Sequence, residues 1–196
     1  MHLTCSIGLD PERSHPVGEV RSAFRIDDMI VAVDVQYTQD QAIAAGVLFD
    51  GWQDAEPLEE CVSMIENVAA YEPGKFFKRE LPCLLQLLAE HRLHADCIVV
   101  DGYVYLDGVS RAGLGKHLYD ALGGGVPVVG VAKKRYADIG PQFEVFRGAS
   151  GRPLYVTSVG LELEHAKESV RAMHGAHRLP TLLKRVDQIC RGMRPV

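Results

Sequence analysis

The sequence has no run of apolar residues long enough to span a bilayer, and no apolar N-terminal segment of the length of a signal peptide. Its cysteines are odd in number and form no Cys-x-x-Cys pair, which argues against a disulfide framework and against a zinc cluster. They are Cys5, Cys61, Cys83, Cys97 and Cys190. We therefore expect a soluble cytoplasmic protein with reduced, mostly buried thiols.

Positive charge is also scarce. The chain has 21 Lys and Arg against 26 Asp and Glu, a formal net charge of -5. This balance gives no global attraction to nucleic acid and argues against a protein that coats DNA or RNA. A local basic groove beside a bound cation would still hold a phosphate backbone. The glycines at 123–125 are not followed by Gly-Lys-Ser/Thr, so they indicate a helix end and not a phosphate-binding loop.

The composition is that of one globular domain. With 196 residues, 47% of them hydrophobic and 24% charged, the chain is long enough to bury a sizeable core. We expect a single domain over 1–196. Prolines and glycines interrupt residues 1–25, which we expect to form an irregular N-terminal lead.

Hydrophobic patterns predict an α/β fold. Residues 30–37 and 42–49 are apolar, and the polar turn between them favours an antiparallel hairpin. Residues 61–68 have a mixed period, so a third strand and a helix both remain open there. Further strands are expected at 98–105, 126–131 and 154–159, and helices at 81–88, 114–122, 163–173 and 181–190. The expected architecture is a mixed sheet, antiparallel over its first three strands and parallel thereafter, with helices on both faces.

Three acids stand out on this frame: Asp34 and Asp101 in apolar strands, and Glu80 at a helix N-terminus. Burying a carboxylate is costly unless a cation or hydrogen-bond donors compensate. Two carboxylates about 4 Å apart repel by roughly 4 kcal/mol at an effective dielectric near 20. A shared proton or a divalent cation would relieve this repulsion, and each acid alone could simply cap a helix or turn. Oxygen ligands without a nearby Cys or His pair favour Mg²⁺ or Mn²⁺.

Several motifs in a shared order carry a family resemblance. They are Val33-Asp34-Val35-Gln36-Tyr37, Tyr71-Glu72-Pro73-Gly74 leading to Phe77-Lys78-Arg79-Glu80, Val100-Asp101-Gly102, Gly130-Val131-Ala132-Lys133-Lys134, Pro153-Leu154-Tyr155-Val156, Ser158-Val159-Gly160 and Arg178-Leu179-Pro180. Together they resemble the endonuclease V family over most of the chain from Ile30 onward.

The resemblance implies a ribonuclease H-like fold and an endonuclease of DNA repair that depends on Mg²⁺, with Mn²⁺ as a substitute. The implied substrate is nucleic acid with deaminated bases, chiefly inosine. The implied cut falls at the second phosphodiester bond 3′ to the lesion and leaves a 5′-phosphate and a 3′-hydroxyl. A cation would neutralise charge that develops at the phosphorus.

The resemblance also implies roles for individual residues. Asp34 and Asp101 would hold the metal, and Glu80 would complete the catalytic group. Lys133 would place a point charge near the phosphate or the attacking water, although outside the motif it would be an ordinary solvated lysine.

Other matching residues are expected to contact nucleic acid. Tyr71, Pro73 and Gly74 match a wedge that enters the duplex beside the lesion, where Tyr can stack on a base and Gly allows close backbone approach. Gly102 and Gly113 belong to the same expected surface.

The chain departs from the family pattern after Gly102. Residues 103–111 stand where the family carries a Gly and a His-Pro-Arg stretch, and we expect Arg111 to replace the missing arginine. His117 is expected to be a phosphate contact, or a packed or surface histidine. Glu164, after a second departure, is either a fourth carboxylate at the metal or a helix cap.

Three functions remain open at this point. The first is a deoxyinosine-directed endonuclease acting on DNA that contains deoxyinosine or other deaminated bases. The second is a catalytically weak nucleic-acid-binding relative, because of the altered loop at 103–111 and the acidic balance. The third is a nuclease of inosine-containing RNA. None of them involves a membrane or an obligate protein partner.

Overall fold

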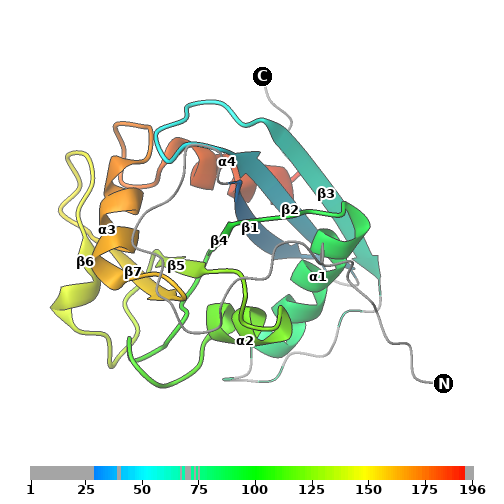
Figure 1. Ribbon diagram of the computed structural model, residues 1–196, viewed down its shortest axis with the longest axis horizontal. Helices are drawn as coiled ribbons and strands as arrows, with labels where there is room; N and C mark the ends of the chain where they lie inside the picture. The colour runs from blue at the N-terminus through cyan, green and yellow to red at the C-terminus, as the bar shows by residue number, and fades with distance from the viewer. Residues whose placement is uncertain are drawn as a thin grey trace.

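The computed structural model describes residues 29–38, 41–66, 68, 72, 74 and 76–192. These residues form a seven-stranded mixed sheet in the order β3-β2-β1-β4-β5-β7-β6 (Figure 1). The strands are β1 (Ile30–Tyr37), β2 (Gln41–Phe49), β3 (Glu59–Glu66), β4 (Cys97–Val100), β5 (Val128–Ala132), β6 (Glu144–Val145) and β7 (Leu154–Val159).

The strand directions agree with the expected mixed sheet in the first half of the chain. β1, β2 and β3 form an antiparallel meander, and β1, β4 and β5 are parallel neighbours. β7 differs, because it pairs antiparallel with β5 and with the short strand β6. A parallel β5–β7 pair would need a crossover, usually a helix, and between these strands the chain forms only β6 and the 3₁₀ helix η1 (Pro141–Phe143).

Helices cover both faces of the sheet. The helices are α1 (Phe77–Glu90), α2 (Leu114–Ala121), α3 (Leu163–Ala172) and α4 (Thr181–Cys190). α1 and α2 pack on one face and α3 and α4 on the other, as Figure 1 shows. Alternate residues of the strands supply the two cores, so Val31 and Val33 face α1 while Ile30 and Ala32 face α4.

Burial decides between a strand and a helix for the segment 61–68, and favours the strand. Residues of β3 alternate between buried and exposed from Cys61 to Glu66, which is the period of a strand. β4 ends at Val100, earlier than the expected end at Tyr105. The lead at 1–25 lies outside the described residues. Within the described part of the chain, no helix combines the length and the apolar character that a membrane span requires.

Candidate metal centre

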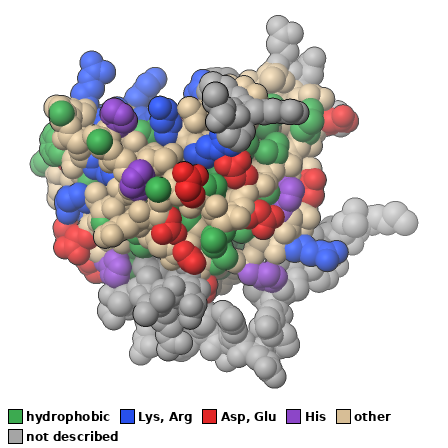
Figure 2. All heavy atoms as spheres, turned by 90° about the horizontal axis from the view of Figure 1, so that it is seen from above, with side chains coloured by type: hydrophobic (Ala, Val, Ile, Leu, Met, Phe, Trp, Pro, Cys, Tyr) green, Lys and Arg blue, Asp and Glu red, His purple; other side chains and the backbone are tan. Residues whose placement is uncertain are grey.

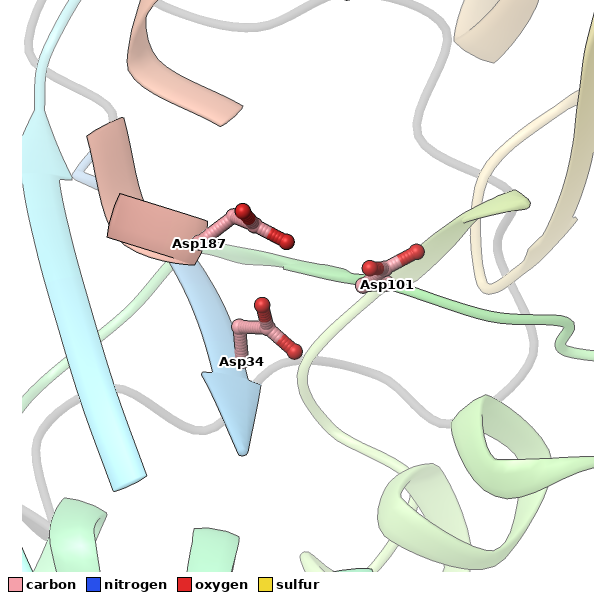
Figure 3. A group of neighbouring side chains, drawn as sticks. All are labelled: Asp34, Asp101 and Asp187. Atoms are coloured by element: carbon pink, nitrogen blue, oxygen red, sulfur yellow. The ribbon is translucent and has the colours of Figure 1, made fainter. Parts of the chain in front are cut away.

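Three carboxylates meet at one edge of the sheet. Asp34 lies in β1, Asp101 directly follows β4, and Asp187 lies in α4. Each offers one oxygen, and these oxygens all lie within 4.8 Å of one another. Figure 3 shows the three side chains near one another at this edge.

Topology explains why these acids meet. β1 and β4 are parallel neighbours, and Val33 opposite Val100 is their last paired position. The next residues, Asp34 and Asp101, therefore lie at the same edge of the sheet. In sheets of this kind, functional groups gather beyond the carboxyl ends of the strands. Asp187 reaches the same edge because α4 packs across β1 and β2.

The Asp34 carboxyl is held in an environment that disfavours its charge. Burial, and then the nearby charge of Asp101, raise its pKa from the ordinary 3.8 to about 7. The Val35 backbone N–H donates a hydrogen bond of 2.8 Å to the Asp34 side chain, which opposes the shift. The Cys190 thiol donates to the Asp34 carbonyl oxygen at 3.1 Å, which ties the end of α4 to β1.

Glu80 is a fourth acid next to this group. It lies in the first turn of α1, as the sequence predicts, and is 7% exposed. Burial, followed by the charges of Asp34 and Asp101, raises its pKa from the ordinary 4.5 to about 9. Two buried acids that resist ionisation beside two further carboxylates form a site that a cation would stabilise.

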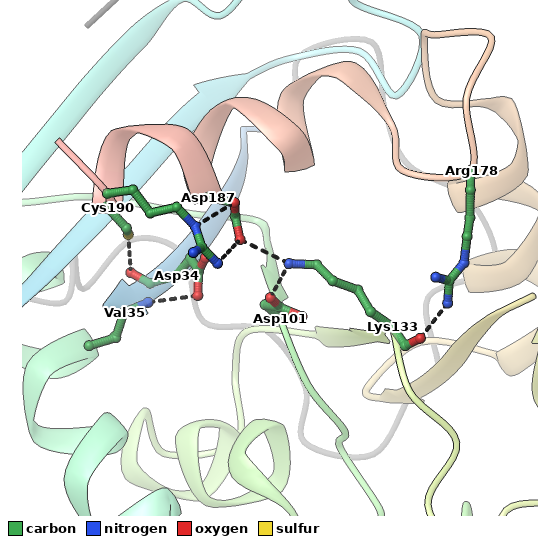
Figure 4. A network of polar contacts seen from close by, with 8 residues as sticks. Asp34, Val35, Asp101, Lys133, Arg178, Asp187 and Cys190 are labelled. Atoms are coloured by element: carbon green, nitrogen blue, oxygen red, sulfur yellow. Dashed lines mark hydrogen bonds and ion pairs between the residues drawn. The ribbon is translucent and has the colours of Figure 1, made fainter. Parts of the chain in front are cut away.

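Lys133 supplies positive charge within the group. Its ammonium, at the end of β5, donates to Asp101 at 2.6 Å and to Asp187 at 3.1 Å (Figure 4). Burial lowers the pKa of Lys133, but the bonds to both carboxylates outweigh it and raise the pKa above its ordinary value. Arg191 donates two further bonds to Asp187, of 2.9 and 3.2 Å. Lys133 thus lies within hydrogen-bond distance of two of the three clustered acids.

The donor set fits a hard divalent cation. Asp34, Asp101 and Asp187 offer carboxylate oxygens only, which are the ligands that Mg²⁺ and Mn²⁺ prefer. The side chains of Asp101 and Asp187 remain 30% and 20% exposed, so the group is accessible from solvent. Beneath it lie apolar residues, among them Val33, Val131 and Leu183.

Asp187 is the acid that the sequence reasoning missed. It was hidden in an ordinary amphipathic helix, where an acid usually faces solvent. Its position carries a signal nevertheless, because Leu183, Val186 and Cys190 on the same side of α4 are buried. A carboxylate on the apolar face of a helix, in a chain with other buried acids, marks a residue worth testing.

The structure does not bring Glu164 into this group. Glu164 lies in the first turn of α3, its side chain is 62% exposed, and it pairs with Lys167 at 2.7 Å. The neighbouring Glu162 accepts a hydrogen bond from the His165 backbone N–H and caps the helix. The surroundings of Glu164 match the alternative in which this acid lies at the start of a helix.

The altered loop after Gly102 is well ordered. Asp107 accepts hydrogen bonds of 2.8 to 3.0 Å from the backbone N–H groups of Val109, Ser110 and Arg111. These bonds lower the pKa of Asp107. The Arg111 guanidinium is exposed, lies 5.5 Å from the centre of the Tyr136 ring and approaches Asp138 at 3.9 Å. The loop therefore presents Arg111 from a fixed backbone.

The remaining predicted contacts lie in varied settings. His117 in α2 stacks on Phe77 at the start of α1, with ring centroids 3.7 Å apart. Gly74 is exposed, with a φ of 77°. Gly102 has open space where a Cβ would lie, whereas a Cβ on Gly113 would come within 2.4 Å of the Tyr103 carbonyl oxygen. Close packing thus accounts for Gly113. Tyr71 and Pro73 lie outside the described residues.

The molecule carries charge of both signs around these elements. On the face seen from above in Figure 2, acidic side chains gather near the middle and Lys and Arg side chains lie mainly toward one edge. This distribution agrees with the net charge of -5. Any attraction to a polyanion must therefore be local.

Comparison of the sequence with protein families gives one assignment for most of the chain. The family model described as Endonuclease V matches residues 18–150. A protein named endonuclease V from Xanthomonas oryzae pv. oryzae (strain PXO99A) is 32% identical over 123 residues, which are 58% of this chain and 49% of that relative. The matched stretch thus spans about half the length of the relative.

Solved structures show the same fold. Endonuclease V from Streptomyces avermitilis is 27% identical, with a TM-score of 0.67 and coverage of 85% of this chain and 81% of that one. Endonuclease V from Ciona intestinalis, in complex with a 24mer DNA containing an inosine followed by a ribo-adenosine, is 16% identical, with a TM-score of 0.68 and coverage of 84% and 85%. The expected ribonuclease H-like fold is confirmed.

Proposed function

Because this chain belongs to the endonuclease V family, we propose that it is a metal-dependent endonuclease of DNA repair that cuts at the second phosphodiester bond 3′ to deoxyinosine. The products would carry a 5′-phosphate and a 3′-hydroxyl. The observation that carries the proposal is the meeting of Asp34, Asp101 and Asp187 from three separate elements within 4.8 Å. Neither a helix cap nor a surface charge accounts for that convergence.

The acids would hold Mg²⁺ or Mn²⁺. When bound, such a cation stabilises negative charge on a phosphate and lowers the pKa of water. Asp34, Asp101 and Asp187 would supply the ligand oxygens, which makes Asp187 a proposed member of the site. Glu80 adds a buried carboxyl beside them that the surroundings hold protonated at neutral pH, since its pKa is raised to about 9. It would keep a proton, or release one as positive charge enters the site.

Lys133 would act as a point charge toward the phosphate. Its ammonium already lies within hydrogen-bond distance of two of the proposed metal ligands. A phosphodiester drawn to the same edge would meet that ammonium without a large movement of the backbone. Arg111, Gly102, Gly74 and His117, together with Tyr71 and Pro73, remain proposed contacts along the strand.

A paired cleavage assay tests the proposal. An inosine-containing DNA oligonucleotide, the same sequence in RNA, and an inosine-free DNA would each be incubated with the protein and Mg²⁺ or Mn²⁺. We expect a single cut in the inosine DNA, with ends that a ligase accepts. Cleavage of inosine RNA alone would assign the chain to RNA instead. Binding of the lesion without cleavage in any metal would favour the weakly catalytic relative.

Variants of the clustered acids test which of them belong to the site. Asp34→Asn, Asp101→Asn and Asp187→Asn should each lower cleavage by at least about 100-fold, because each removes a charged ligand from a site that positions the reacting groups. Glu168→Gln, an exposed acid in α3, is the matched control and should cut normally. Isothermal titration with Mn²⁺ adds a second measurement, in which Asp187→Asn weakens binding. Unchanged cleavage and unchanged Mn²⁺ binding in Asp187→Asn would remove this residue from the site.

A further inference from the structure

Arg178 bridges the backbone where two strands stop pairing. Its Nε and Nη2 groups donate to the Pro153 carbonyl oxygen at 3.2 and 2.7 Å. Nη2 also donates to the Lys133 carbonyl oxygen, the contact of Arg178 drawn in Figure 4. The β5–β7 pairing reaches Ala132 opposite Tyr155 and goes no further. Pro153 has no N–H to donate to a ladder. The guanidinium therefore replaces strand pairing at the position that carries Lys133.

The segment around Arg178 also borders the acid group. Leu179 lines the same small pocket as Asp101 and Lys133. Two residues later the chain enters α4, which carries Asp187. The chain between α3 and α4 thus touches Lys133 at its backbone and leads directly to an acid that Lys133 contacts.

A second arginine fixes the backbone that carries Arg178. Arg147 follows β6, is 6% exposed, and its guanidinium donates only to backbone carbonyls among its described hydrogen bonds. Those carbonyls belong to Arg171, Met173, Gly175, His177 and Arg178. A buried guanidinium is stabilised by several acceptors at once, which makes this connection between α3 and α4 a rigid support.

We propose that Arg178 is a positioning residue: it holds the backbone at Lys133 so that the lysine ammonium reaches Asp101 and Asp187. Arg178 acts through Lys133 and touches neither the acids nor the scissile phosphate. The kinetic part of this inference rests on the proposed nuclease function. The structural part does not, because the bridge exists in the chain itself.

Kinetics distinguish positioning from direct contact with nucleic acid. For Arg178→Gln we expect the single-turnover rate constant to fall by about 10- to 100-fold, the effect of a small misplacement of a reacting group. The Kd for an inosine oligonucleotide should change less than about twofold, since no phosphate contact is lost. Arg178→Lys keeps a cationic donor, although it lacks the planar fork of the guanidinium, and should recover part of the rate. Arg152→Gln, which removes an exposed positive charge next to Pro153, should behave as wild type.

A double variant shows whether Arg178 acts through Lys133. If it does, Lys133→Gln combined with Arg178→Gln should cut no more slowly than Lys133→Gln alone, within about twofold. Multiplicative losses would overturn the inference. So would a raised Kd with an unchanged rate constant, because that pattern marks a direct phosphate contact.

Amide hydrogen exchange of the protein alone supplies a measurement that needs no cleavage. Peptides that cover 131–137 should exchange faster in Arg178→Gln than in wild type and in Arg152→Gln. If wild type cuts no inosine substrate while this change is seen, the proposed function fails and the backbone support stands. If wild type cuts and Arg178→Gln changes neither the exchange nor the rate, the positioning role is overturned.

Discussion

At the scale of single residues, the site contains two buried acids whose ionisation is unfavourable. The pKa values of Asp34 and Glu80 are raised to about 7 and about 9 from ordinary values of 3.8 and 4.5. Both shifts are caused mainly by burial, and the charge of Asp101 adds to each. The chain accepts this cost at one edge of the sheet, whereas most of its buried side chains are apolar. Such a concentration is typical of functional sites.

A pH dependence of stability follows from these two shifts. Between pH 4 and pH 9 the folded chain binds more protons at Asp34 and Glu80 than the unfolded chain does, so the free energy of unfolding should fall as pH rises. The slope is about 1.4 kcal/mol per pH unit for each proton that differs. Asp187, whose pKa is lowered, titrates below this window.

Urea unfolding in a chelator at pH 5, 7 and 9 measures that slope. Glu80→Gln should flatten it above pH 7, because a neutral amide has no proton to lose. Lys116 pairs with Asp120 on the surface of α2, which makes Asp120→Asn a suitable control with an unchanged slope. An identical slope in wild type and Glu80→Gln would show that Glu80 is ionised in the folded chain.

At the scale of elements, the loop between β4 and α2 is built around one acid. Asp107 satisfies three successive backbone N–H groups, and the chain closes through the Leu106 N–H, which donates to the Arg111 carbonyl oxygen at 2.7 Å. Ordering these residues before binding lowers the entropy lost when a ligand is engaged.

Asp107→Ala should therefore weaken nucleic-acid binding through Arg111. We expect the Kd for the inosine oligonucleotide to rise by about 3- to 10-fold, while Mn²⁺ binding to the acids stays unchanged. Fluorescence anisotropy gives the Kd, and Arg111→Gln provides the comparison. The two changes should not be additive, because they disturb one contact. A wild-type Kd in both variants would exclude this loop from the binding surface.

The sequence predicts several elements at their observed bounds and misses others for physical reasons. β1 and α4 are found where expected, since a β-branched run and a period of 3.6 residues are strong signals. Tyr103 and Val104 extend an apolar run past Val100, yet they leave the sheet. The Val104 N–H donates to the Thr157 side chain and its carbonyl accepts from Gly113, so burial there does not require strand pairing.

The acids of the candidate site also differ in how well the sequence predicts them. Asp34 and Asp101 are recognisable because each interrupts or follows an apolar strand, and parallel pairing brings strand ends together. Asp187 is not recognisable from its spacing, because the crossing of α4 over β1 and β2 determines what its side chain meets. The residues next to Asp187 in the sequence do not indicate how α4 crosses the sheet.

At the scale of the whole molecule, the net charge of -5 limits how the chain finds a polyanion. Lys133, Lys134 and Arg135 lie together after β5, and the described Arg111 lies on the loop above Tyr136. We therefore expect contacts with phosphates to be made by a few such side chains, with little attraction from the rest of the surface.

The salt dependence of nucleic-acid binding measures the number of phosphate contacts. Each neutralised phosphate contributes about -0.9 to the slope of log K against log salt on duplex DNA, so about three contacts predict a slope near -3. Lys134→Gln should reduce the magnitude of the slope by about one contact. Binding of an inosine duplex between 50 and 300 mM salt provides the measurement. A slope steeper than about -6 would mean that charges far from the acids take part.

The path of the chain through the site has a consequence for its synthesis. Asp34 and Asp101 come from β1 and the end of β4, but Asp187 comes from α4, the last helix of the described chain. A ribosome that has made the sheet has therefore made only a pair of the three clustered acids. Domains generally fold as units during synthesis, so the cluster of three acids is completed only after α4 has left the ribosome. A chain that terminates before α4 lacks Asp187 and also the residues that α4 adds to the core.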